Sequence, residues 1–158
     1  MGVSGSGKTT VGQALASHLQ LQFFDGDDFH SPANKAKMAS GLPLTDGDRE
    51  PWLEALAGLM AEKDCILACS SLKKNYRKTM AKDMKDEDKL VFIYLKGSQE
   101  VIERRLTNRQ GHYFKAELLQ SQFDALEAPT NDENAVTVYC DENIDIIVET
   151  IVEYIKTK

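Results

Sequence analysis

Short apolar runs alternate along this chain with longer segments in which apolar residues recur at helical spacing. The apolar runs predict buried strands at residues 22–24, 65–69, 90–95 and 136–139. The intervening pattern predicts helices at residues 10–19, 32–39, 47–62, 72–80, 99–108 and 144–155. Pro51 should lie in the first turn of the third of these helices, and Ser98 should cap the fifth. Because strands and helices alternate, we predict an α/β fold, a mostly parallel sheet covered by helices on both faces. Ligands bind at the carboxyl ends of the strands in such folds.

The composition suits one globular domain. The chain has 158 residues, 42% of them hydrophobic, and no linker or repeat divides it, so we predict a single domain over residues 1–158. The formal net charge of −6 argues against nucleic acid as a main partner, because duplex binding requires a concentrated basic surface. The sequence shows neither a signal-peptide core nor an uninterrupted apolar span, which predicts a cytoplasmic protein with no membrane partner.

The cysteines give no sign of metal or redox chemistry. Cys65, Cys69 and Cys140 are odd in number and lack the spacing of a zinc site. Two of them lie in one apolar strand with their side chains on the same face. We therefore expect the cysteines to pack in the core.

A phosphate-binding motif opens the chain. Residues 2–9, Gly-Val-Ser-Gly-Ser-Gly-Lys-Thr, match G-x-x-x-x-G-K-[ST] at every fixed position, and a predicted helix follows them. In this motif backbone N–H groups and the helix N-terminus surround phosphate oxygens, Lys8 reaches the β- and γ-phosphates, and Thr9 offers a hydroxyl to Mg²⁺. A flexible Gly/Ser segment is the alternative, and the helical pattern that follows argues against it. The predicted ATP-binding residues of this loop are Gly2, Val3, Ser4, Gly5, Ser6, Gly7, Lys8, Thr9 and Thr10.

The strand that should present this loop is not visible in the sequence. A phosphate loop of this type follows a buried parallel strand, whereas only Met1 precedes Gly2 here. We therefore expect the first, central strand to be missing from the sheet. The chain as given would then either start downstream of its native start or be poorly stable, since such a strand contributes on the order of 10 kcal/mol before entropy is subtracted.

Three aspartates follow the first of the predicted strands. Asp25, Asp27 and Asp28 come directly after the strand at residues 22–24, on the rim where the phosphate loop should lie. Carboxylates at this place can hold Mg²⁺ or orient an attacking hydroxyl. The alternative is a polar turn that caps the next helix.

Cations gather at two later positions of the same rim. Arg49, between Asp46 and Asp48, offers a planar fork for a substrate carboxylate, although a salt bridge to a neighbouring Asp would also explain it. Lys73, Lys74 and Arg77 crowd the start of a helix after the strand at 65–69, where a solvated helix face is the alternative.

A candidate lid lies farther along the chain. Arg104, Arg105, Arg109 and His112 surround a glycine-containing stretch at residues 110–114, between two helices. We predict a lid over residues 109–127 that closes over ATP, brings cations to the transferred phosphoryl group and excludes water.

Six segments in order along the chain share a pattern with one family of kinases: GVSGSGKTT, FFDGDDFH, NKAKMASGLPLTDGDREPWLEAL, CSSLKKNYRK, FIYLKG and RRLTNRQGHYFKAELLQSQFDALEAP. They resemble the gluconate kinases (gluconokinases) of the small phosphate-loop type. The resemblance covers nearly the entire chain, and residues 38–53 and 111–129 carry its most specific motifs. It implies ATP- and Mg²⁺-dependent phosphorylation of D-gluconate at the 6-hydroxyl, giving 6-phospho-D-gluconate and ADP, by a cytosolic homodimer. It also implies a three-layer α/β/α fold of the phosphate-loop NTPases, similar to shikimate and nucleoside monophosphate kinases.

The resemblance also implies site roles. By analogy with shikimate kinases, Asp27 accepts a hydrogen bond from the attacking hydroxyl, Asp25 and Thr9 hold hydrated Mg²⁺, and Lys8 and Asp27 are catalytic. Arg105 and Arg109 would join the ATP site. The predicted substrate-binding residues are Asp27, His30, Arg49, Lys74, Arg77, His112 and Gln122. Two alternatives stay open: a kinase for another small hydroxy acid, and a shortened nucleotide-binding form with little or no catalytic activity.

Overall fold

The computed structural model describes residues 1–84, 89–108 and 116–158, and of residues 116 and 117 only the backbone. Each strand and helix predicted from the sequence pattern is present, and the boundaries shift by a few residues. In chain order the elements are α1 (Lys8–Leu19), β1 (Gln22–Asp25), the 3-10 helix η1 (Gly26–Phe29), α2 (Pro32–Ala39), α3 (Asp46–Glu62), β2 (Cys65–Ala68), α4 (Lys74–Ala81), β3 (Phe92–Lys96), α5 (Gln99–Thr107), α6 (Ala116–Ala125), β4 (Ala135–Tyr139) and α7 (Ile144–Lys156).

Polar residues at the helix starts explain several of these boundaries. Ser31 caps α2 before Pro32, and Ser98 caps α5 as the sequence predicts. Thr45 and Asp48 form a reciprocal capping box at the start of α3. Because α3 begins at Asp46, Pro51 lies inside the helix and not in its first turn as predicted, and its missing N–H removes one helical hydrogen bond. None of the described helices is long and apolar enough to cross a membrane.

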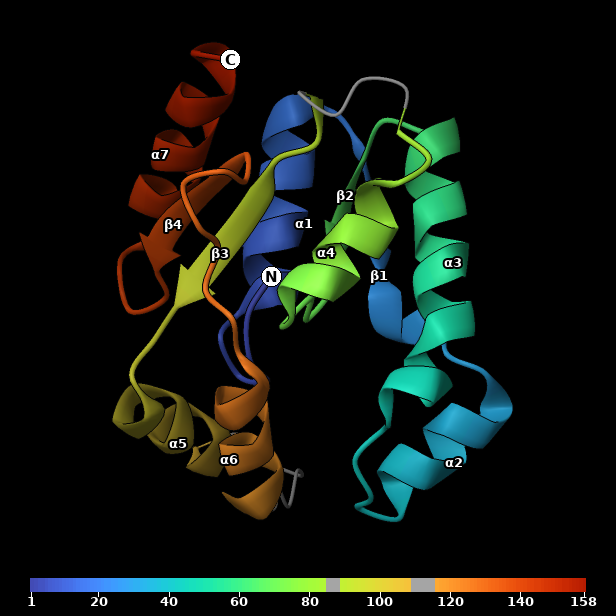
Figure 1. The fold of residues 1–158 in the computed structure, drawn as a ribbon. Coiled ribbons are helices and arrows are strands. Elements are labelled where there is room, and N and C mark those ends of the chain that lie inside the picture. Colours follow the sequence, from blue (N-terminus) through green and yellow to red (C-terminus); the bar gives the residue numbers. More distant parts are fainter. Residues whose placement is uncertain (85–88, 109–115) are drawn as a thin grey trace.

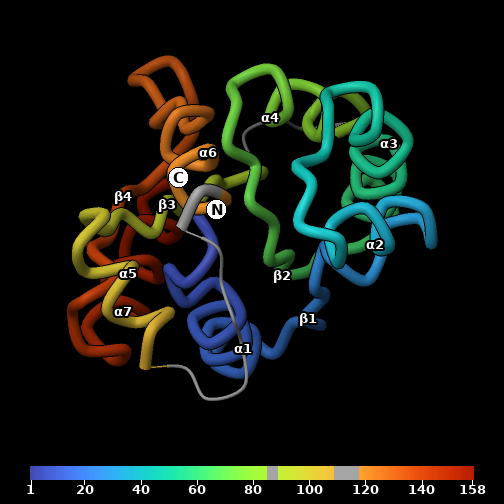
Figure 2. Tube along the Cα trace, turned by 90° about the horizontal axis from the view of Figure 1, so that it is seen from below, coloured from blue at the N-terminus to red at the C-terminus, as the bar shows by residue number. Residues whose placement is uncertain are grey.

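The strands form two parallel pairs instead of one continuous sheet. β1 pairs with β2, with Gln22 opposite Cys65, and β3 pairs with β4, with Phe92 opposite Ala135. The first residues of the chain lie between β2 and β3 (Figure 2). Gly2 N donates to Ser70 O at 3.1 Å on one side, and Leu95 N donates to Met1 O at 3.0 Å on the other. Met1 and Gly2 thus bridge the two pairs at the place where a central strand was expected.

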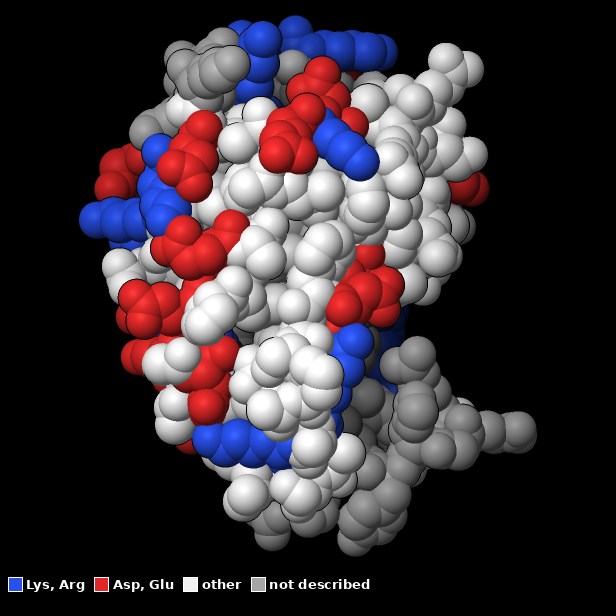
Figure 3. All heavy atoms as spheres, turned by 90° about the vertical axis from the view of Figure 1, so that its right-hand side faces the viewer, with Lys and Arg blue, Asp and Glu red and all other residues white. Residues whose placement is uncertain are grey.

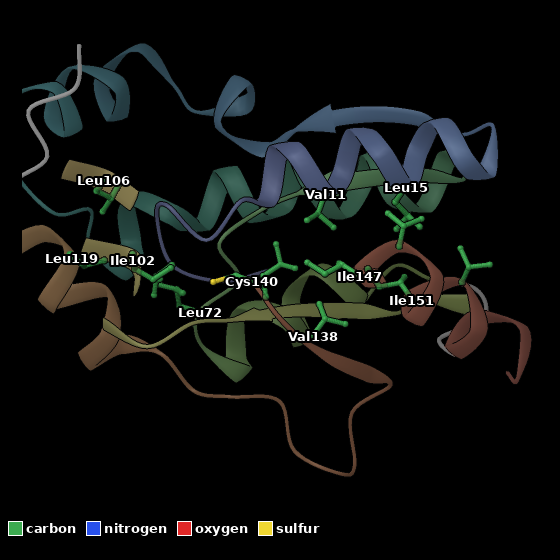
Figure 4. Close-up of a cluster of buried hydrophobic side chains, with 14 residues drawn as sticks. Val11, Leu15, Leu72, Ile102, Leu106, Leu119, Val138, Cys140, Ile147 and Ile151 are labelled. Atoms are coloured by element: carbon green, nitrogen blue, oxygen red, sulfur yellow. The ribbon is translucent and has the colours of Figure 1, made fainter. Parts of the chain in front are cut away.

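Helices cover both faces of these strands, in three layers (Figure 1). On one face, Val11 and Leu15 of α1 meet Ile147 and Ile151 of α7 over Val138 of β4 (Figure 4). On the opposite face, α3 and α4 enclose a second, smaller apolar cluster of Trp52, Leu53, Leu56, Cys69, Tyr76 and Met80. The two clusters hold the carboxyl ends of the strands at a common rim.

Two of the three cysteines belong to these apolar clusters, Cys140 to the larger and Cys69 to the smaller. Cys69 and Cys140 are buried, Cys65 is half-buried, and all three are free. Burial raises the pKa of each thiol above its ordinary value. A raised pKa keeps the thiols protonated and poorly reactive, as expected of core residues.

Because the strands form two separate pairs, an added strand between β2 and β3 should increase the thermal stability of the fold. A designed extension of about five apolar, β-branched residues before Met1 could pair with β2 and β3 and bury side chains worth roughly 1.5–3 kcal/mol each before ordering entropy. Since about 1 kcal/mol moves the melting midpoint of a domain of this size by roughly 2–4 °C, we expect a rise of about 5–15 °C. Calorimetry would measure it against a Gly/Ser extension of equal length. Equal midpoints for the two extensions would show that β2 and β3 accept no further strand.

Candidate active site

The phosphate loop packs tightly against α5. Gly5 and Gly7 have φ angles of 80° and 93°, in the left-handed region that favours glycine. A Cβ on Gly5 would lie 2.9 Å from the side chain of Leu106. The buried hydroxyl of Ser6 has no hydrogen-bond partner among the described residues. A left-handed glycine at the start of α1 and an unpaired buried hydroxyl fit an anion cradle that uses the helix N-terminus.

Lys8 folds back onto this loop. Its Nζ donates to Val3 O at 2.9 Å. Burial lowers the pKa of Lys8, while the carboxylates of Asp27 and Asp25 oppose that shift. Lys8 therefore lies within electrostatic reach of both carboxylates that the sequence assigns to the chemistry.

Thr9, Asp25 and Asp27 come together as predicted from their positions at the rim. Thr9 Oγ1 donates to Asp25 Oδ2 at 3.3 Å, and Asp27 N donates to Asp25 Oδ1 at 3.1 Å. Asp25 thus caps η1 through one oxygen and faces the start of α1 with the other. A hydroxyl and a carboxylate are ligands that suit Mg²⁺, which keeps several waters and binds phosphate oxygens as well. The Asp27 side chain is 86% exposed and free to meet a substrate.

His30 lies beneath Asp27. Its Nε2 is 4.0 Å from Asp27 Oδ1, and its side chain is 4% exposed. The imidazole stacks on Trp52 with ring centroids 4.3 Å apart. Trp52 Nε1 in turn donates to Gly26 O at 2.7 Å, so α3 supports the turn that carries Asp27.

Arg49 belongs to a polar cluster between the starts of α3 and α4. Its guanidinium lies 5.7 Å from the ring centroid of Tyr76 and donates to Leu44 O. Lys73 Nζ lies 5.4 Å from the same ring and donates to Asp46 Oδ1 at 2.9 Å. Hydrogen bonds from Tyr76 and Lys73 lower the pKa of Asp46. Sequence reasoning gave Tyr76 no role, although the predicted helix at residues 72–80 would put Tyr76 on the same face as Lys73, three residues earlier.

Lys74 and Arg77 are engaged elsewhere. Lys74 Nζ binds Asp132 Oδ2 at 2.8 Å and Thr130 Oγ1 at 2.9 Å. Arg77 is 1% exposed, with Nε at 2.5 Å from Glu133 Oε2 and Nη2 at 2.9 Å from Glu133 Oε1. Arg77 Nη1 also donates to Ser71 O, at 3.0 Å. A substrate contact by Arg77 would require this bidentate ion pair to open.

The Arg77–Glu133 pair should contribute strongly to stability. Arg77→Met would leave Glu133 nearly buried without its partner, and we expect a loss of about 3–5 kcal/mol in the free energy of unfolding, measured by denaturant titration. Lys74→Met, which removes the exposed neighbouring pair, should cost far less. Equal losses for both variants would contradict this account.

The contribution of the Arg77–Glu133 pair to stability should depend on pH. Arg77 holds the pKa of Glu133 below its ordinary value of 4.5. A carboxylate with a lowered pKa stabilises the fold above its ordinary pKa and loses that contribution as the pH falls through its folded pKa. The stability difference between wild type and Arg77→Met should therefore shrink as the pH falls below 4.5, the ordinary pKa of Glu133.

Gln122 of α6 reaches the phosphate loop. Its Oε1 accepts a hydrogen bond from Ser4 N at 2.6 Å. Arg105 Nη1 lies 3.6 Å from the place of a Cβ on Gly7, and its Nη2 donates to Cys140 O. Both residues thus lie beside the loop. Arg109 and His112 lie outside the described residues.

The comparisons with known proteins agree with this geometry. A family model described as shikimate kinase matches residues 4–156. The thermoresistant gluconokinase of Escherichia coli (strain K12) is 44% identical over 162 residues, covering 99% of this chain and 91% of that protein. The chain belongs to the gluconokinase family. A probable gluconokinase of Dictyostelium discoideum is also 44% identical, over 99% of this chain and 84% of that one.

A solved gluconokinase shares the fold. The crystal structure of a gluconokinase from Sinorhizobium meliloti 1021 matches with a TM-score of 0.92 at 37% identity, covering 99% of this chain and 89% of that one. The predictions of a gluconokinase-type kinase and of a phosphate-loop α/β fold are therefore confirmed. The roles of individual residues stay predictions.

Proposed function

We propose that this gluconokinase transfers the γ-phosphoryl group of ATP to the 6-hydroxyl of D-gluconate, giving 6-phospho-D-gluconate and ADP. The observation that carries the proposal is the convergence of Lys8, Thr9, Asp25 and the exposed Asp27 carboxylate at one rim. Phosphorus NMR of the product would test the position of transfer, because a 6-phosphate couples to the two protons on C6. A product without that coupling would contradict the assigned hydroxyl.

ATP phosphates would lie in the loop of residues 2–10, with Arg105 and Arg109 beside them. Thr9 and Asp25 would hold Mg²⁺ and its waters, and the metal would offset charge on the β- and γ-phosphates. Lys8 leaves Val3 O and pairs with phosphate oxygens, where its charge stabilises the transferring group. Positioning and electrostatics carry most of the catalysis in such transfers.

Asp27 orients the attacking hydroxyl. Its exposed carboxylate accepts a hydrogen bond from the alcohol, which aligns an oxygen lone pair with the γ-phosphorus. Because an alcohol holds its proton tightly in the ground state, Asp27 accepts that proton late, as the new phosphorus–oxygen bond forms.

Arg49 binds the carboxylate of the substrate, which distinguishes an aldonate from a neutral polyol. Lys74, Arg77, His112 and Gln122 are the further proposed substrate residues. The sequence also assigns His30 to the substrate, but its side chain is only 4% exposed. In the described structure Lys74 and Arg77 pair with Asp132 and Glu133, and Gln122 binds Ser4. Their contacts with substrate would need these partners to be exchanged.

Arg49→Lys tests the carboxylate contact. An ammonium loses the bidentate fork, so we expect the KM for gluconate to rise about tenfold with a smaller change in kcat. Steady-state kinetics with gluconate and with neutral polyols would measure it. An equal loss with every acceptor would argue against carboxylate pairing.

A second acceptor class deserves a direct test, because the matching family model is described as shikimate kinase. A panel of aldonates, shikimate and nucleoside monophosphates separates the candidates by kcat/KM. We expect gluconate to be preferred. A higher kcat/KM for shikimate would favour the other assignment.

We further propose a cytoplasmic homodimer with no nucleic-acid or membrane partner. The net charge of −6 supports the absence of a nucleic-acid partner, as does the face that carries α2 and α3, where described Lys and Arg side chains are interspersed with Asp and Glu (Figure 3). The homodimer and the cytoplasmic location are what the family resemblance implies. Sedimentation equilibrium would measure the oligomeric state.

A further inference from the structure

The buried imidazole of His30 lies beside the proposed catalytic carboxylate of Asp27. Asp27 lies on η1, a short 3-10 helix, with its side chain mostly in solvent. Within the described residues, His30 is the one side chain at ion-pair distance from that carboxylate. An exposed carboxylate on a short turn can adopt several rotamers, so a fixed neighbour restricts where it points.

His30 is itself held rigidly. The imidazole and indole planes differ by 17°, and Trp52 is 4% exposed within the apolar cluster of α3 and α4. Gly26 O fixes the indole, and a Cβ on Gly26 would lie 2.9 Å from Ala68 O, so this turn sits directly against β2. A rigid support therefore runs from β2 and α3 through Trp52 and His30 to Asp27.

The hydrogen-bond environment defines the form of the ring. Nδ1 is buried and has no hydrogen-bond partner among the described residues, whereas Nε2 faces the Asp27 carboxylate. We assign the proton of the neutral ring to Nε2, because this N–H then faces the Asp27 carboxylate at 4.0 Å and Nδ1 is left as a bare acceptor. Protonation of Nδ1 would bury an unpartnered N–H, which is costly.

We propose that His30 is a positioning residue that, as a neutral imidazole, directs the Asp27 carboxylate toward the alcohol hydroxyl of the acceptor. The proposal rests on the proposed role of Asp27. It differs from direct binding of substrate by His30, because the ring is buried and its effect passes through Asp27.

The charges around His30 define its pH response. Asp27 faces it from η1, Lys35 from α2, and Arg49 and Trp52 from α3. Burial lowers the pKa of His30 below its ordinary value of 6.5, Asp27 opposes the shift, and Arg49 and Lys35 reinforce it. At acidic pH the imidazolium would bind the carboxylate as an ion pair and withdraw it from the acceptor, so kcat should fall.

Three variants test the role in turnover. His30→Gln keeps a donor near the position of Nε2, whereas His30→Leu removes it. We expect His30→Leu to lower kcat about 10–100-fold with KM for gluconate and ATP within about twofold, and His30→Gln to recover most of kcat. The acid limb of the kcat profile should move to lower pH in His30→Gln. His18→Gln, an exposed histidine on α1, is the matched control and should leave kcat unchanged.

Trp52 provides a readout that does not need activity, because it is the single tryptophan of the chain. A stacked imidazolium quenches indole fluorescence more than a neutral imidazole does. We expect the wild-type emission to change with an inflection below pH 6.5, the ordinary pKa of His. The inflection should be absent in His30→Gln and should move lower in Asp27→Asn, since loss of the carboxylate disfavours the charged ring.

Each other outcome overturns the proposal. An increased KM for gluconate with unchanged kcat in His30→Leu would assign a direct substrate contact. Equal losses of kcat and stability in both His30 variants would show that His30 has only a packing role. A fluorescence inflection unaffected by Asp27→Asn would show that His30 and Asp27 are not coupled. If the wild type fails to phosphorylate gluconate, the proposed function fails, while the fluorescence titration still decides the coupling.

Discussion

Asp27→Asn should lower kcat with D-gluconate by about 10²–10⁴-fold while the Kd for ATP stays nearly unchanged. The amide has almost the same shape as the carboxylate, but it cannot take a proton from the attacking hydroxyl. The Asp27 side chain is largely exposed and makes no hydrogen bond that holds the fold together in the described residues, so stability should change little. Steady-state turnover and ATP titration on the same preparation would measure both quantities.

Asp28→Asn is the matched control. Asp28 is the next residue, is also exposed, and uses its backbone oxygen to accept a hydrogen bond from Lys35. The same chemical change there should leave kcat within about twofold. Full turnover in Asp27→Asn, or equal losses in the two variants, would remove the role assigned to Asp27.

Lys8→Met should lower kcat/KM for ATP by about 10²–10³-fold or more, because removal of one preorganised donor from a developing anion typically costs this much. Burial lowers the pKa of Lys8, and the carboxylates of Asp27 and Asp25 oppose that shift and so favour its charged form. Its hydrogen bond to Val3 O places the side chain against the phosphate loop.

Lys63→Met provides the comparison for a lysine outside the site. Lys63 is exposed at the end of α3, with its ammonium 5.7 Å from the centroid of the Phe24 ring, and its loss should not affect ATP kinetics. ATP-dependent turnover that survives in Lys8→Met would contradict the phosphate-loop assignment. A circular dichroism melt of each variant would confirm that the fold is intact.

The strands, the helices and the phosphate loop were predictable from the sequence because their signals are local. Apolar runs, Ser98 as a cap and the fixed spacing of Gly2 to Thr9 each depend on neighbours in the chain. Even so, α4 begins at Lys74 and not at residue 72. Leu72 is instead buried in the core, and Lys73 adopts an extended backbone that a periodicity argument does not detect.

The side-chain partners of the site were less predictable because they depend on distant segments. Arg77 was assigned to substrate from its position after a strand, whereas its partner Glu133 lies far along the chain. The contact of Gln122 with Ser4 joins residues 118 positions apart. The sequence predicted that a central strand is missing, but not that the remaining strands divide into two pairs. The contacts by which Met1 and Gly2 bridge these pairs join segments that are distant in the chain, so a local pattern does not indicate them.

The most direct test of the central claim is the turnover of ATP by the purified chain in a coupled assay for ADP, with and without D-gluconate and Mg²⁺. The account predicts ADP formation that depends on both and is lost in Lys8→Met and Asp27→Asn. A chain that binds ATP but forms no ADP in response to gluconate would contradict it and would support a non-catalytic nucleotide-binding form.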